Sequence, residues 1–65
     1  MKILIDLPTE TKTINCPEGG YLTPIITEHG DLIVNEGHPN CYTEITRIVC
    51  AKGTWDKYEI DNSRG

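Results

Sequence analysis

The sequence predicts an all-β protein, a small antiparallel barrel or sandwich of five to six short strands. The first observation is composition, because nine isoleucines, eight threonines and two valines stand against four leucines and one alanine. β-Branched side chains favour strands over helices. The second observation is the position of the Gly and Pro residues, which separate the apolar runs and mark turns between them. The third is the length of 65 residues, since so short a chain buries only about 60% of its unfolded surface and supports one small domain.

The predicted strands of the first half are short and separated by turns. They lie at residues 2–7, 12–16, 21–27 and 32–34, and residues 35–40 form the longest loop. Ile3, Ile5 and Leu7 share one face of the first strand, which is the period-two pattern of a half-buried strand. Pro8 closes that strand because proline cannot donate to a ladder, and Pro24 places the third strand at a sheet edge or a bulge.

Residues 41–52 fit two patterns. At helical spacing Cys41, Ile45 and Ile48 share a face, which gives an alternative α+β fold with one helix at about 41–52 packed on an antiparallel sheet. At period two the same segment is a strand, and its β-branched and aromatic residues favour that interpretation. A turn at 51–54 and a second alternating segment at 55–60 then predict a C-terminal hairpin. Six such strands suit an SH3-like or OB-like barrel or sandwich.

The chain is expected to form one compact β-rich domain over residues 1–60. Residues 61–65 lack a large apolar side chain and should form a frayed polar tail. The N-terminus lacks the apolar segment of a signal peptide, and no apolar run approaches the ~18 residues of a membrane span. We therefore expect a cytoplasmic protein, in the cytosol of a host cell, with no membrane partner.

The charge argues against direct binding to nucleic acid. Ten acidic and six basic residues give a net charge of −4, which repels phosphate backbones on average. The basic residues form no run. A partner is therefore expected to be a protein.

Three cysteines, an odd number, argue for reduced thiols rather than disulfides. Cys16, Cys41 and Cys50 together with His38 could hold zinc, which would stabilise so small a domain. Only His38 and Cys41 have the close spacing of a zinc knuckle, and free cysteine is often simply buried. We favour buried thiols, and the metal content stays open.

No catalytic motif is present in the sequence. The one serine, Ser63, lies in the polar tail, and no glycine-rich phosphate loop occurs. We therefore expect a protein that is not an enzyme and needs no cofactor.

The aromatic residues indicate where a partner could bind. Phenylalanine is absent, and every aromatic side chain has a polar group suited to a partly wet interface. A C-terminal hairpin would place Trp55 and Tyr58 on opposite faces, so that one of them points outward. The candidate partner-binding residues come from this segment and from the long loop with its flanks: Glu36, His38, Tyr42, Trp55, Asp56, Tyr58 and Glu59.

Binding is the function that such a chain can carry, because its apolar residues are needed for its own core. In size, charge and lack of motifs it resembles the small inhibitors encoded by phages and mobile elements, including anti-CRISPR and other anti-defence proteins. That resemblance implies surface binding that blocks a larger host protein, and it identifies no functional residue. The alternatives are a zinc-stabilised adaptor module and an oligomeric sponge for a small ligand such as a nucleotide signal. A homo-oligomer is compatible with each, since association adds core to a small domain.

Overall fold

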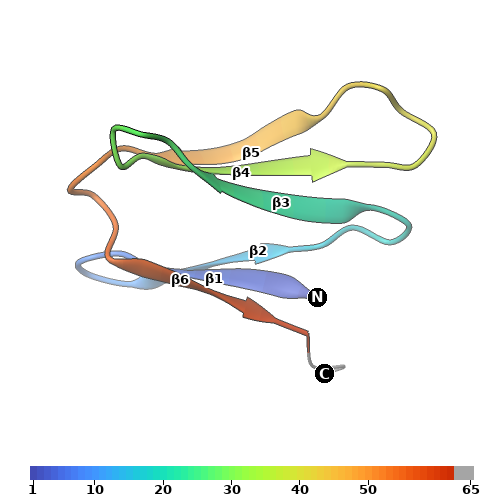
Figure 1. Ribbon diagram of the computed structural model, residues 1–65. Coiled ribbons are helices and arrows are strands. Elements are labelled where there is room, and N and C mark those ends of the chain that lie inside the picture. The colour runs from blue at the N-terminus through green and yellow to red at the C-terminus, as the bar shows by residue number, and fades with distance from the viewer. Residues whose placement is uncertain (63–65) are drawn as a thin grey trace.

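A computed structural model describes residues 1–62 of the protein, which contain six strands (Figure 1). They are β1 (Lys2–Asp6), β2 (Thr11–Asn15), β3 (Tyr21–Ile26), β4 (Leu32–Gly37), β5 (Ile45–Cys50) and β6 (Lys57–Asp61). Within the described residues no segment is helical, so no helix there could cross a membrane. The all-β class expected from the β-branched composition is confirmed.

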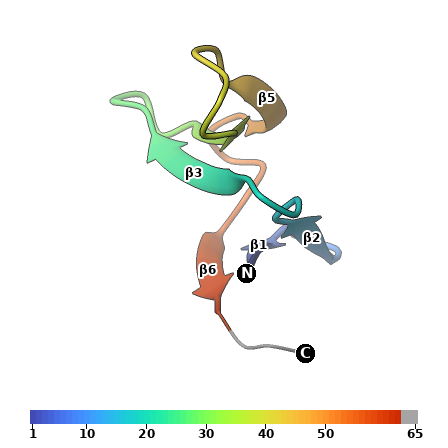
Figure 2. The same ribbon diagram turned by 90° about the vertical axis from the view of Figure 1, so that its right-hand side faces the viewer.

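The strands form two three-stranded antiparallel sheets. Sheet A has the order β2-β1-β6, and sheet B is the meander β3-β4-β5. The two sheets lie one above the other as separate layers (Figures 1 and 2). Over residues 1–62 no strand of one sheet pairs with a strand of the other, so the predicted barrel is not closed. The fold is therefore an open two-sheet arrangement, with free edges on both sheets.

One apolar core joins the two layers. Its buried side chains come from both sheets: Ile3, Ile5, Ile14, Leu22, Leu32, Val34 and Cys50. The central strands contribute the four that are fully buried, which are Ile3 and Ile5 on β1 and Leu32 and Val34 on β4. Full burial of one such side chain stabilises the fold by about 1.5–3 kcal/mol. The two central strands therefore supply the largest part of the apolar stabilisation.

The alternative helix at 41–52 is wrong. Residues 45–50 form β5, and a turn follows in which the Thr54 N–H donates to the Ala51 carbonyl oxygen at 3.0 Å. The inward side chains of β5 alternate at period two, and Cys50 is buried opposite Leu32. Residues 45–50 form a strand because a strand can pair with β4 and extend sheet B over the core. A helix in this segment could not add to the sheet.

The predicted C-terminal hairpin is also wrong, although both of its arms are strands. β5 pairs with β4, whereas β6 pairs with β1 in the other sheet. The chain crosses between the layers after the turn, and the Asp56 N–H donates to the Asp6 carbonyl oxygen at 2.8 Å. This crossing gives β1 a second neighbour, which makes it the central strand and buries Ile3 and Ile5.

Several predicted boundaries differ from the observed ones. The loop expected at 35–40 is wrong in its first half, because β4 continues to Gly37. The polar tail was expected to begin at Asp61, which instead is the last residue of β6 and lies opposite Lys2. Residues 63–65 of that predicted tail lie outside the described residues.

Candidate functional site

The candidate site lies at one end of sheet B, where three polar side chains meet. Glu36, near the end of β4, accepts a hydrogen bond from His38 Nε2 to its Oε2 at 2.8 Å. Its other carboxylate oxygen, Oε1, pairs with Arg47 Nη1 on β5. The Glu36 side chain is only 13% exposed, so both contacts are partly shielded from water. The carboxylate thus ties the start of the β4–β5 loop (residues 38–44) to the strand that follows it.

A β-bulge brings Arg47 into this cluster. Val34 lies opposite Ile48, but the next residue of β4, Asn35, lies opposite Thr46, so Arg47 has no partner on β4. An extra residue of this kind bends its strand and redirects its side chain. Here it places the guanidinium beside Glu36, two strand positions beyond Val34.

Both neighbours act on the ionisation of Glu36. The hydrogen bond from His38 first, and that from Arg47 second, lower the pKa of the Glu36 carboxyl below its ordinary value, although burial opposes them. Donors that favour the charged form stabilise the carboxylate. Each of its oxygens already accepts a hydrogen bond, so Glu36 holds the loop in place and is poorly suited to abstract a proton.

Two close contacts pack the base of the loop. The Tyr21 ring covers Gly37, where an added Cβ would lie 2.3 Å from Tyr21 Cζ. The turn at 17–20 approaches His38, and a Cβ on Gly20 would lie 2.9 Å from His38 Cε1. Glycine is required at close approaches of this kind. The packing fixes the position from which the loop projects.

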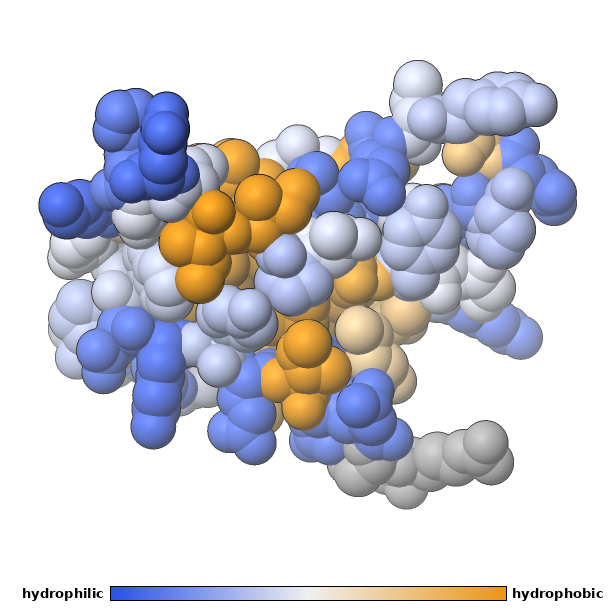
Figure 3. Space-filling view, in the orientation of Figure 1, coloured by the Kyte–Doolittle hydropathy of each residue, from blue (hydrophilic) through white to orange (hydrophobic). Residues whose placement is uncertain are grey.

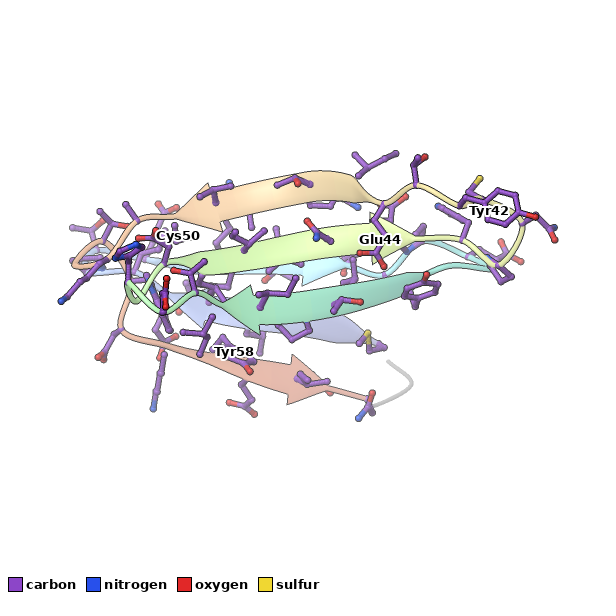
Figure 4. All side chains as sticks on the ribbon, turned by 45° about the horizontal axis from the view of Figure 1, so that its top comes forward. Tyr42, Glu44, Cys50 and Tyr58 are labelled. Carbon is purple, nitrogen blue, oxygen red and sulfur yellow. The ribbon has the colours of Figure 1, made fainter. Side chains whose placement is uncertain are left out.

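Tyr42 lies at the tip of this anchored loop. The loop turns at its start, where the Cys41 N–H donates to the His38 carbonyl oxygen at 3.0 Å. The Tyr42 side chain is fully exposed and projects beyond the ends of the strands (Figure 4). Glu44, also exposed, lies on the return to β5. An exposed tyrosine on a held loop can enter a partner's surface at a low cost in conformational entropy.

The other predicted binding residues lie in sheet A or on the segment that enters it. Tyr58 is on β6, far from Tyr42 (Figure 4). Trp55 and Tyr58 are partly buried and pack against the core, with ring centroids 6.4 Å apart. The expectation that one of them points outward is wrong, because β6 pairs with β1 and places Tyr58 opposite the buried Ile5. Asp56 and Glu59 are exposed.

The candidate zinc ligands are not brought together. Cys50 is buried in the core, Cys41 is exposed on the loop, and the Cys16 thiol donates to the Gly20 carbonyl oxygen at 3.3 Å. Among residues 1–62 no three His, Cys, Asp or Glu side chains form a group that could hold a metal ion. The zinc-stabilised alternative therefore has no ligand set in the described part of the chain.

Two residues of this end of the sheet were not predicted from the sequence. Arg47 has no local signal, because its role depends on a bulge relative to β4, whose Glu36 lies eleven residues earlier in the chain. Tyr21 had an indirect signal in Gly37, since a glycine within a strand often marks the close approach of another group. Recognising it required the antiparallel register that places Tyr21 opposite Gly37.

The comparisons with known proteins identify no relative. No family model, no curated protein and no solved structure matches this chain. What is established is therefore the class, a small all-β domain of two antiparallel sheets. Any function has to be argued from its surface.

Proposed function

We propose that this protein is a non-enzymatic binding protein that blocks a larger host protein through its β4–β5 loop, with Tyr42 as the main contact residue. The observation that carries the proposal is the full exposure of Tyr42 on a loop whose base is held by Glu36. Binding energy is concentrated in a few side chains, and tyrosine is among the residues enriched there.

The anchoring of the loop supports this choice over the alternative at β6. A loop already held before binding loses less conformational freedom in the complex, so more of the contact energy appears as affinity. Trp55 and Tyr58, in contrast, are used by the protein's own core. Removing them from that core to reach a partner would cost stability.

The charge of the protein indicates the character of the partner. The net charge of −4 and the exposed Glu44, which follows Tyr42 on the same loop, favour a basic surface with an apolar recess for the tyrosine ring. Association with such a surface is accelerated at low salt. In small size and acidic charge the protein resembles phage and mobile-element inhibitors. The proposed partner is therefore a cytosolic bacterial protein of the kind that anti-CRISPR or other anti-defence proteins inhibit.

The experiment is capture from bacterial lysate by the immobilised chain, compared with two variants. The wild type and Lys12→Gln, altered at an exposed position on β2 of sheet A, should retain the same partner. Tyr42→Ala should weaken its binding by at least about tenfold, as expected for a central interface tyrosine. Equal capture by all three chains, or no partner with any of them, contradicts the proposal.

A further inference from the structure

The outer faces of the two sheets differ in charge. On sheet A the residues that alternate with the buried ones include five charged side chains: Lys2, Asp6, Lys57, Glu59 and Asp61. Two cross-strand ion pairs join four of them, Lys2 Nζ to Asp61 Oδ2 at 3.9 Å and Lys57 Nζ to Asp6 Oδ2 at 4.0 Å. This face has the ion-paired character of a surface that faces water.

None of the described residues that the strand register places on the outer face of sheet B is charged. The register places eight residues on it: Tyr21, Thr23, Ile25, Ile33, Asn35, Gly37, Thr46 and Val49. Ile25 lies opposite Ile33, and Ile33 lies opposite Val49, so one apolar row crosses all three strands. Val49 is 59% exposed and Ile25 is 40% exposed. In Figure 3 apolar side chains are visible over sheet B, in the upper part of the view, and others lie on the lower sheet.

A polar but uncharged row lies beside the apolar one. Thr23, Asn35 and Thr46 face one another across the strands, and the Thr46 hydroxyl donates to Asn35 Oδ1 at 3.0 Å. Part of the hydrogen-bonding capacity of this row is thus satisfied within the sheet. A surface resting on it need not supply charged groups.

We propose that this face binds a second copy of the chain, giving a two-fold dimer in which two B sheets pack face to face. Two copies that each carry a net charge of −4 repel one another, and the repulsion is smallest where the apposed surfaces hold no charge. A charged partner surface would lose its hydration here without gaining an opposite charge. The uncharged face is instead complementary to itself, and every copy supplies it.

The symmetry identifies the centre of the contact. In a face-to-face dimer the same patch of both copies meets about the two-fold axis. Ile33 is the middle member of the apolar row, so it lies closest to the axis and meets Ile33 of the second copy. Ile25 and Val49 then extend the contact to either side.

The size of the face predicts a weak dimer. Three strands of six residues cover on the order of 300 Å², given the rise per residue and the spacing between strands. A stable interface takes about 800 Å² from each partner. We therefore expect a weak dimer, so that the protein is monomeric when dilute and dimeric when concentrated.

Sedimentation equilibrium of the full chain tests the dimer directly. From about 10 µM to about 1 mM the mean mass should rise from 7.3 kDa toward twice that value. Val49→Asp should raise the dissociation constant at least about tenfold, and Val49→Thr, which keeps the branched shape, should raise it by a smaller factor. Thr13→Asn, on the outer face of sheet A, should leave it unchanged. A monomer across the whole range, or a dimer that Val49→Asp does not weaken, overturns the proposal.

Cross-linking tests the position of the axis. In a chain with the exposed Cys41 replaced by serine, Ile33→Cys should form a disulfide-linked dimer on mild oxidation, and Ile25→Cys should do so more slowly. Thr13→Cys, on the outer face of sheet A, should not. Equal cross-linking at positions 13 and 33, or none at 25 and 33, contradicts the face-to-face arrangement. Tyr42→Ala should not change either result, because the loop lies outside this face.

Discussion

Trp55 donates its indole N–H to the carbonyl oxygen of Gly30 at 3.1 Å, and this bond links the two sheets. Gly30 lies in the turn between β3 and β4 of sheet B, whereas Trp55 precedes β6 of sheet A. The Lys52 N–H adds a second contact to the same turn, donating to Asp31 Oδ1 at 2.8 Å. The crossing between the layers is therefore fixed by hydrogen bonds as well as by apolar packing.

Trp55→Phe should lower the free energy of unfolding by about 1–3 kcal/mol, because it removes the hydrogen bond to Gly30 and part of the buried ring. Urea denaturation measures the change. Tyr42→Phe is the matched control, since that side chain is fully exposed, and it should change stability by less than about 0.5 kcal/mol. Equal stability of Trp55→Phe and the wild type would show that the crossing does not depend on this residue.

Glu36→Gln tests the carboxylate that anchors the loop. The pKa of Glu36 is lowered in the folded protein, so its contribution to stability is full above the ordinary pKa of 4.5 and is lost as the pH falls through the lowered value. Tm of the wild type should exceed that of Glu36→Gln near neutral pH, and the difference should shrink as the pH falls toward about 2. A difference that stays constant over this range contradicts the assignment.

The core is tested by a pair of isoleucines. Ile5→Ala should cost about 2–5 kcal/mol, because it leaves a cavity beneath the central strand of sheet A. Ile26→Ala, at a position that is 53% exposed, should cost about 1 kcal/mol or less. Both values come from chemical denaturation. Similar costs at the two positions would mean that the core does not lie between the sheets.

Gly37→Ala should destabilise the fold by about 1–3 kcal/mol, because the added methyl group meets the Tyr21 ring. In the Tyr21→Ala background the same change should cost much less. The double-mutant cycle measures this coupling. Additive effects of the two substitutions would contradict the contact between them.

The strands were largely predictable because their signals are local. β-Branched runs and alternation located all six, and Gly and Pro marked the turns, as at Gly30, whose φ of 93° suits glycine. The alternation of Ile3 and Ile5 also identified the buried face of β1 correctly. Each of these features depends on residues a few positions apart.

Strand pairing was not predictable in the same way. The turn at 51–54 forms as expected, yet β6 pairs with β1 rather than with β5, because β1 gains burial from a second neighbour more than 50 residues away in the chain. The geometry of the candidate site also depends on how strands pair over long distances in the chain. The sequence names Tyr42 as a candidate, which stays a prediction, whereas the bulge that brings Arg47 to Glu36 depends on the register of β4 against β5.

The most direct test of the proposed binding loop is hydrogen exchange of the chain alone and with its captured partner. Binding through Tyr42 should slow exchange of the backbone amides at residues 38–44 and leave β6 unchanged. Protection confined to β6 and the segment around Trp55, with none in the loop, would contradict the assignment of the binding site.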